Sequence, residues 1–497
     1  MEVVIFGVFV SIPVNLIRLR LVACLLASVL LSSTADAQFM RYGQPVTSGG
    51  YVQSAGDWYG GYVQPAGYTA VPNPSAAPVY SLAQAPIGAM DPYATNQWTQ
   101  PITGLRPFGG YFADRFSGTG WNPNFIPQMP GYAGDQAGRL WLRTDYLHWW
   151  TEGMETPPLV TTSTAGTAQN VAAVLGESNT SVLYGGQQIN GDSVNGLRFR
   201  GGFWLTPTRA YGIESEFFAL ENQDDRYVGF SDGTNIIGRP FFDIANGRET
   251  AQLVSFPAVA AGSVTVESDT DLKSFMLAGR AALNPPRASP VCQYNACDDR
   301  IDWLVGYRYV DLDEQLRFTE NIDSLLVGAP GSIAIGESFR TQNEFNGLQL
   351  GVAYQANFNR MWLESLLRVA VGYNTQRVTI AGNTALTEAG ITDQFNGGLL
   401  AQRTNIGTHE RDQFSMIPEI GLTLGYRIRS WLHATAGYTV MYYPSVVRPG
   451  DQIDRDVNPN LLAPEVVPFT GALRPGFRFI ESDYVAHGLS LGAEFRF

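Results

Sequence analysis

Charge is scarce in this sequence, and lysine is almost absent. Only 15% of the 497 residues are charged, whereas a soluble globular domain carries about 25%. Lys273 is the single lysine, and the formal net charge is −13. This charge excludes a nucleic-acid-binding protein, because such a protein needs a basic face. No glycine-rich phosphate-binding loop stands between a strand and a helix. A surface so poor in charge is typical of a protein in contact with lipid.

Long apolar runs are also missing. The longest candidate, Leu21–Leu31, has 11 residues, fewer than the roughly 18 that a membrane-spanning helix needs. Arg18 and Arg20 precede this run, and small residues follow at Ala35 and Ala37. This order is typical of a signal peptide cleaved after Ala37. The sequence therefore predicts a signal peptide over residues 1–37 and export from the cytoplasm.

Cysteine and histidine are too few for most metal and nucleophile chemistry. Cys292 and Cys297 are close together in Pro-rich sequence with no histidine nearby. A metal site needs more ligands, so in an oxidising compartment we expect a structural disulfide between them. The four histidines, namely His148, His409, His433 and His487, are spread along the chain without a nucleophile turn beside them. We therefore expect no enzyme and no cofactor, with an outer-membrane hydrolase as the least favoured alternative.

The segment 38–138 has low complexity. It is rich in Gly, Pro, Tyr, Gln, Ala and Ser, and Gly49–Gly56 is nearly repeated at Gly60–Gly67. No periodicity here is long enough to bury a core, which predicts a disordered periplasmic segment. Two interpretations remain: a plain linker, or a tether that contacts a cell-wall or surface polymer through its tyrosines.

From Arg139 to Phe497 the sequence alternates with a period of two residues. Between Asp412 and Ile428, large apolar residues such as Phe414 and Leu424 alternate with small or charged ones such as Glu419. This pattern favours a strand with one face toward lipid and the other toward a lumen. The chain ends on such a strand, with Phe495 and Phe497 on its apolar face. This ending resembles the signal read by bacterial barrel-assembly machinery, which we expect as a partner together with outer-membrane lipid.

Ten candidate strands can be delimited in this region. They are Arg139–Trp150, Asn195–Leu205, Ala210–Glu221, Asp271–Ala282, Arg300–Asp311, Glu344–Asn357, Arg360–Tyr373, Asp412–Ile428, Trp431–Tyr443 and Tyr484–Phe497. Long and short connections alternate between them, as periplasmic turns and external loops do in bacterial barrels. The sequence therefore predicts an all-β, antiparallel up-and-down transmembrane barrel of about 10–14 strands, over residues 139–497, with long external loops.

Charged residues of both signs lie on the predicted lumen face. They are Arg143, Asp145, Glu214, Glu216, Arg280, Arg308, Glu364, Arg368, Glu419 and Arg427. A barrel of about eight strands is filled by side chains, and wide channels appear at sixteen or more. These residues therefore predict either a selectivity filter or internal ion pairs that fill the barrel.

Several segments resemble a known family. The first strand and its exit read Asp145-Tyr146-Leu147-His148-Trp149-Trp150, and a later loop reads Tyr443-Pro444-Ser445-Val446-Val447-Arg448-Pro449-Gly450-Asp451. Together with Leu304–Tyr309 and Asn346–Gly351, these segments resemble the putative beta-barrel porin family 7 of planctomycete type, over about residues 139–497. The resemblance implies an exported outer-membrane barrel and brings no characterised substrate or catalytic residues.

Three further groups of residues are candidates for local roles. Aromatic residues near strand ends are expected to form girdles at the membrane interface or a sugar-stacking platform; they are Tyr146, Trp149, Trp150, Trp431, Tyr442 and Tyr443. Asp454, Asp456, Asn458 and Glu465 have the spacing of a calcium loop, although a polar external loop explains them more simply. Arg448 and Arg474 are candidates for contact with lipopolysaccharide phosphates.

These observations lead to two main functional hypotheses. The first is a porin for small solutes. The second is a structural or surface-binding outer-membrane barrel that acts through its external loops without an open pore.

Overall fold

A computed structural model of the protein describes residues 139–283 and 299–497. The expected signal peptide over residues 1–37, the low-complexity segment over residues 38–138 and the expected disulfide between Cys292 and Cys297 lie outside the described residues. Within the two described ranges, no helix is long and apolar enough to cross a membrane.

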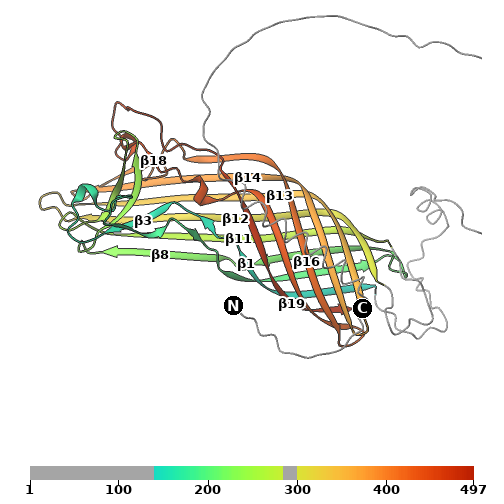
Figure 1. The fold of residues 1–497 in the computed structure, drawn as a ribbon. Helices are drawn as coiled ribbons and strands as arrows, with labels where there is room; N and C mark the ends of the chain where they lie inside the picture. The colour runs from blue at the N-terminus through green and yellow to red at the C-terminus, as the bar shows by residue number, and fades with distance from the viewer. Residues whose placement is uncertain (1–138, 284–298) are drawn as a thin grey trace, which may run out of the picture. The chain divides into compact units, whose positions relative to one another are not determined.

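Ten antiparallel strands close into a barrel (Figure 1). The barrel strands are β1 (Leu140–Thr151), β6 (Ser193–Trp204), β7 (Tyr211–Leu220), β11 (Ala260–Ala282), β12 (Arg300–Ser324), β13 (Gly331–Phe358), β14 (Met361–Glu388), β16 (Gly407–Arg427), β17 (Leu432–Val447) and β19 (Glu481–Arg496). The first and last strands of the ring in sequence order, β1 and β19, pair with each other. The predicted fold class, an antiparallel transmembrane barrel, is confirmed.

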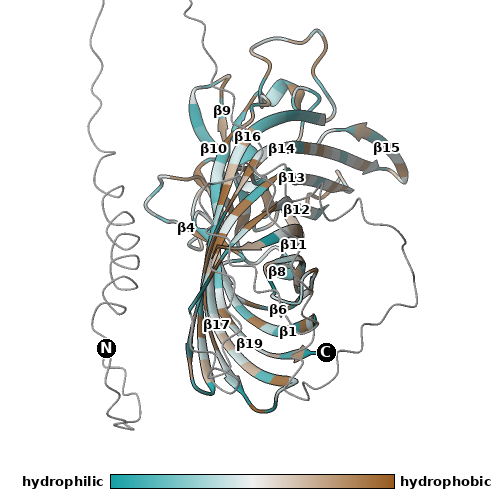
Figure 2. Ribbon diagram, turned by 90° about the vertical axis from the view of Figure 1, so that its right-hand side faces the viewer, coloured by the Kyte–Doolittle hydropathy of each residue, from teal (hydrophilic) through white to brown (hydrophobic). Residues whose placement is uncertain are grey.

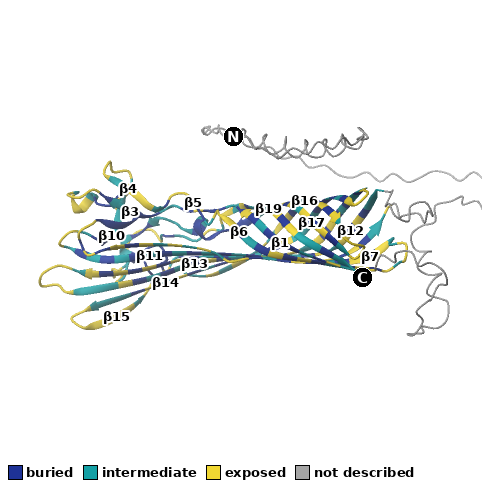
Figure 3. Cartoon of the chain, turned by 90° about the horizontal axis from the view of Figure 1, so that it is seen from below, coloured by how far each residue is buried: buried dark blue, intermediate teal, exposed yellow. Residues whose placement is uncertain are grey.

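The two-residue alternation sends apolar side chains outward and charged ones inward. On β1, Leu142 is 43% exposed, whereas its neighbour Arg143 is only 1% exposed. Figures 2 and 3 show the same alternation of hydropathy and burial along the barrel strands. Since no water surrounds a barrel in the bilayer, the exposed apolar face is the one that contacts lipid.

Tight turns gather at one end of the barrel. Only Asn359 and Arg360 separate β13 from β14, and residues 428–431 separate β16 from β17. Asn359 has a φ of 55°, a left-handed conformation that asparagine tolerates better than most residues. Short turns of this kind face the periplasm in bacterial barrels, so the opposite end faces outward.

Several strands are far longer than the sequence analysis predicts. We predicted that one strand ends at Asp311 and that the next begins at Glu344, yet β12 continues to Ser324 and β13 already begins at Gly331. The long external loop expected here is therefore wrong, because most of it is a continuous hydrogen-bonded hairpin. β11 and β14 also continue outward beyond their predicted ends.

The apolar face of the strands changes from the outer to the inner side where they leave the membrane. For this reason the sequence pattern did not predict these extensions. In the barrel part of β12, Trp303 and Val305 point outward. In its extension, Leu316 and Phe318 are fully buried on the inner face, while Arg317 is exposed. The predicted strands were those whose apolar side would face lipid. The extensions have their apolar side on the inner face, so they do not fit that pattern.

The extended strands and several smaller ones form an outer lobe. Its further strands are β2 (Met154–Glu155), β3 (Pro158–Ser163), β4 (Thr180–Gly185), β5 (Gln188–Ile189), β8 (Gln223–Ser231), β9 (Ile237–Asp243), β10 (Arg248–Ser255), β15 (Ile391–Asn396) and β18 (Asp456–Val457), with short 3-10 helices at Gln169–Val171, Pro449–Gln452 and Pro459–Leu461. A second sheet, in the order β10, β9, β3 and β4, packs its apolar residues against the inner face of the extended strands. The lobe therefore has a hydrophobic core of its own.

Candidate functional site

The barrel lumen contains a layer of buried charges. Six arginines and six carboxylates lie there, all of them buried: Arg143, Arg198, Arg200, Arg280, Arg308, Arg368, Asp145, Glu214, Glu216, Asp302, Glu364 and Glu419. Their formal charges cancel. Because an isolated buried charge is very costly, this balance is the condition under which such a layer is stable.

Ion pairs in this layer cross the lumen. The Arg200 guanidinium on β6 donates to Glu364 on β14 at 3.1 Å, and these two strands lie on opposite sides of the ring. Arg368 on β14 binds Glu216 on β7 at 2.8 Å and also Glu419 on β16. Side chains from opposite walls therefore meet across the lumen at this level.

An apolar layer lies next to the charged one, toward the outer end. It is a continuous cluster of buried residues from all ten barrel strands: Leu147, Trp149, Val194, Phe218, Leu220, Leu272, Val310, Leu312, Phe345, Ala370, Ile417, Met441, Tyr443, Val446, Tyr484 and Ala486. Trp149 and Phe218 pack ring against ring with their centroids 5.2 Å apart. The barrel thus carries a packed hydrophobic plug above its ion pairs.

The structure places nine of the ten predicted lumen residues inside this charged layer. The exception is Arg427, which lies at the periplasmic turn and donates to Asn357 and to the backbone oxygen of Asn359. Three members of the layer were not predicted: Arg198 and Arg200, which alternate with outward-facing Leu197 and Phe199, and Asp302, which precedes outward-facing Trp303. The two-residue rule, applied to these strands, would have found them.

Two of the expected interfacial aromatic residues face the lumen. Trp149 is 1% exposed and Tyr443 is fully buried, so a role for either in a girdle or an exposed sugar platform is wrong. The reason is the strand period, because Trp149 and Trp150 are consecutive and must point to opposite faces. Trp150 and Tyr442 face outward as expected.

Two of the four histidines, His148 and His487, lie close together on the outer wall of the barrel, where both rings contact Trp150 at centroid distances of 5.0 and 5.9 Å. His148 contacts Asn195, and His487 accepts or donates a hydrogen bond with Tyr438 on the outer wall of the barrel. His409 stacks on Phe477 in the outer lobe, and His433 is buried beside Glu494 near the periplasmic end. His148 and His487 are therefore neighbours on the lipid-facing side of the wall, whereas His409 and His433 lie apart from them.

Three of the four residues with calcium-loop spacing, Asp454, Asn458 and Glu465, have other partners for their side chains. Asp454 accepts from Arg474 at 2.7 Å, and Glu465 pairs with Arg403 at 3.0 Å. The Asn458 side chain donates to backbone oxygens of Thr470 and Ala472. In the part of the chain that the structure describes, no group of three or more acidic, histidine or cysteine side chains is arranged to hold a metal ion.

Buried ion pairs also connect the outer lobe to the extended barrel strands. Arg448, expected as a surface contact for phosphate, is instead buried and donates to both oxygens of Glu314 at 2.7 and 3.0 Å. Arg239 on β9 binds Glu320 on β12 and Glu337 on β13, and it lies over the Phe318 ring at 4.4 Å. Burial raises the pKa of Glu320 more than Arg239 lowers it, and Glu337 adds to the increase.

A small cavity of mixed polar and apolar lining opens in the outer lobe. Its volume is about 220 Å³, and its lining residues are Pro157, Asp451, Gln452, Ile453, Asp454, Arg455, Gly476, Arg478 and Ile480. Burial raises the pKa of Asp451. Two guanidinium groups and two carboxylates thus surround one space outside the membrane.

Comparisons with known proteins point to one family. Residues 141–497 match the family described as putative beta barrel porin-7, while the search of curated proteins found no match. Among solved structures, the outer membrane protease OmpT from Escherichia coli is similar over 74% of this chain and 99% of its own, with 8% identity and a TM-score of 0.33. The TodX monoaromatic hydrocarbon channel is similar over 72% of this chain and 90% of its own, with 8% identity and a TM-score of 0.19.

Proposed function

The chain belongs to the putative beta barrel porin-7 family and is an outer-membrane β-barrel protein, and we propose that it acts through its outer lobe, without an open pore through the barrel. The observation that carries this proposal is the Arg200–Glu364 ion pair across the ring at 3.1 Å. Export by a signal peptide over residues 1–37 and insertion by barrel-assembly machinery are parts of the same proposal.

The filled lumen supports the absence of a pore. A ten-stranded barrel is close in size to the eight-stranded barrels whose side chains fill the interior. Each charge in the layer has partners of opposite sign at good hydrogen-bond distances, such as Arg280 with Asp302 at 2.7 Å and with Glu214 at 2.8 Å. Opening a water-filled path would require separating these pairs and the apolar layer beside them.

The outer lobe supports a binding role. Its cavity offers hydrogen-bond donors from Arg455 and Arg478 and acceptors from Asp451 and Asp454. Saccharides present closely spaced hydroxyl groups that both donate and accept. At about 220 Å³ the cavity is smaller than the roughly 300–1,000 Å³ of common ligand pockets, so it suits a small ligand. The proposed ligand is therefore a small saccharide or the end of a polysaccharide chain.

Electrical recording tests the first part of the proposal. Refolded protein in a planar lipid bilayer is expected to give no conductance steps, while a general diffusion porin in the same apparatus gives them. The alternative, a pore for small solutes, is favoured by the description of the family. Steps of uniform size that grow in number with added protein would establish that alternative and overturn ours.

Glycan binding tests the second part. Detergent-solubilised protein is expected to bind a subset of mono- and oligosaccharides on an array, and Arg478→Ala is expected to weaken this binding. Arg226→Ala, at an exposed position elsewhere on the lobe, is the matched control and should bind as the natural protein does. Equal binding by all three proteins would show that the cavity is not the site.

A further inference from the structure

Two adjacent turns at the periplasmic end of the barrel carry three arginines. Arg360 lies in the turn between β13 and β14, and Arg429 lies in the turn between β16 and β17. The turns adjoin, because the backbone N–H of Arg427 donates to the backbone oxygen of Arg360 at 2.8 Å. The Arg427 side chain reaches across to Asn359 in the neighbouring turn. Three guanidinium groups are thereby concentrated over one short arc of the rim.

No carboxylate within the described ranges neutralises the two outermost arginines. Arg360 and Arg429 are exposed, and neither forms an ion pair with a described residue. Glu494 is the nearby acid of this rim, and it already binds Arg496 at 2.6 Å and lies 3.7 Å from His433. This arc therefore has an excess of positive charge. In the lumen, by contrast, the arginines are balanced by an equal number of carboxylates.

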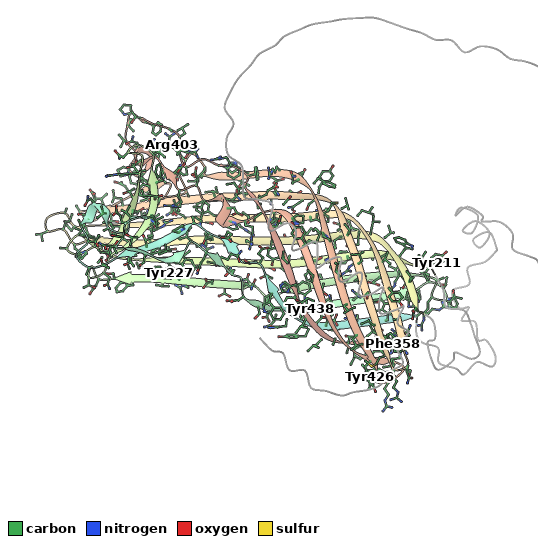
Figure 4. All side chains as sticks on the ribbon, viewed as in Figure 1. Tyr211, Tyr227, Phe358, Arg403, Tyr426 and Tyr438 are labelled. Carbon is green, nitrogen blue, oxygen red and sulfur yellow. The ribbon has the colours of Figure 1, made fainter. Side chains whose placement is uncertain are left out.

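The arginines adjoin an exposed aromatic and apolar border. Phe358, Tyr426 and Trp431 are 53%, 45% and 52% exposed, and Figure 4 shows Phe358 and Tyr426 together at this end of the barrel. Aromatic side chains of this kind lie at the level of lipid headgroups. A phosphate beside Arg360 and Arg429 would therefore have its acyl chains directly against the apolar wall.

The opposite border of the lipid-facing belt has the reverse charge. Where the belt ends toward the outer lobe, the outward positions carry more acidic than basic residues: Asp271, Asp311, Asp313, Glu344, Glu410 and Asp412 against Lys273 and Arg377, which pair with Asp271 and Glu410. This acidic border is unsuited to anionic headgroups, whereas the arginine-rich turns match them. The difference between the two borders indicates that an anionic headgroup would come from the periplasmic leaflet.

We propose that the two turns bind an anionic phospholipid of the periplasmic leaflet. The phosphate lies between Arg360 and Arg429, where guanidinium groups bind phosphate oxygens through paired hydrogen bonds. The acyl chains run along Tyr426 and Trp431. This site is independent of whether the barrel conducts and of what the outer lobe binds.

Native mass spectrometry of the full chain in a neutral detergent tests the proposal. Phosphatidylglycerol and phosphatidylcholine with identical acyl chains are added in turn, and retained lipid is counted. Phosphatidylglycerol is expected to bind more tightly. The Arg360→Gln/Arg429→Gln protein is expected to lose about thirty-fold in affinity for it, and each single variant about fivefold, since each arginine near a lipid surface contributes about that factor. Arg360→Lys/Arg429→Lys is expected to keep the preference for phosphatidylglycerol, which depends on charge, but to bind it more weakly, because lysine cannot form the paired hydrogen bonds. Loss of the preference in this variant would contradict the proposal.

A matched control separates this site from general charge effects. Arg226→Gln/Arg317→Gln removes the same charge from exposed positions of the outer lobe and should bind phosphatidylglycerol normally. Equal retention of the two lipids, or unchanged binding by the Arg360 and Arg429 variants, would overturn the proposal. So would displacement of the lipid by equimolar inorganic phosphate, which would identify a plain phosphate site. Loss of an acidic protein partner in the variants, with lipid binding intact, would also overturn it.

Discussion

Replacing Glu216 by glutamine tests whether the lumen is dry. The Glu216 carboxylate accepts from Arg200 and Arg368 at 2.8 Å each and lies 3.6 Å from Arg308. Glutamine has nearly the same shape, so Glu216→Gln removes one negative charge and little volume. The layer then holds six arginines and five carboxylates.

The expected loss is about 3 kcal/mol in the free energy of unfolding. Removing one partner of a buried ion pair costs about 3–5 kcal/mol. The lower value applies because every arginine keeps another carboxylate: Arg308 keeps Glu419 at 3.1 Å, and Arg200 keeps Glu364 at 3.1 Å. In the double variant Glu216→Gln/Arg308→Met the charges balance again, so part of the loss should be recovered.

Denaturant unfolding in detergent micelles of fixed composition, followed by tryptophan fluorescence, measures this loss. Glu267→Gln is the matched control, because Glu267 pairs with Arg226 at 3.1 Å on the exposed surface, where such a pair contributes about 0–1 kcal/mol. If Glu216→Gln were as mild as Glu267→Gln, water would have to reach Glu216. The lumen would then be hydrated, which contradicts the proposal of a barrel without an open pore.

Three further predictions concern the outer lobe and the barrel wall. The raised pKa of Glu320 means that folding favours its protonated form, so its contribution to stability is complete below about pH 4.3 and is lost as the pH rises through the folded-state pKa. Glu320→Gln should therefore lose less stability than the natural protein between acidic and neutral pH, measured from unfolding midpoints; parallel curves would contradict this. Arg448→Lys cannot reproduce the two-pronged contact with Glu314, so limited proteolysis should cut the segment after Arg448 several-fold faster, and an unchanged rate would argue against this role. In vesicles with brominated lipid, Trp150→Phe should reduce the lipid-dependent quenching of fluorescence whereas Trp149→Phe should not, since only Trp150 faces outward.

Particular residues show how far sequence reasoning reached. The ten predicted barrel strands match the ten strands of the ring, because each has its own period-two pattern that can be found locally. Position near a strand end, the basis for predicting Trp149 and Tyr443 at the interface, does not say which face of the strand a residue occupies. Their parity in the strand, which follows from neighbours such as Arg143 and Asp145, would have placed them in the lumen. The resemblance to the barrel porin-7 family, taken from short segments, is confirmed over residues 141–497.

The extensions of β12 and β13 show a different kind of error. Their alternation is as regular as that of the barrel, but its apolar side is turned inward against the second sheet. A pattern states that one face is apolar and does not state what covers it. A strand face covered by lipid and a strand face covered by a packed protein core give the same alternating pattern in the sequence.

By itself, the amino-acid sequence determined the barrel class, a range of about 10–14 strands, the end that carries the tight turns and the inward face of nine of the buried lumen charges, because all of these depend on near neighbours along the chain. Only the tertiary structure decided whether those inward charges leave a passage. That depends on which walls face each other once β1 has closed on β19. Arg200 and Glu364 are 164 residues apart in sequence and meet only because ring closure brings β6 opposite β14.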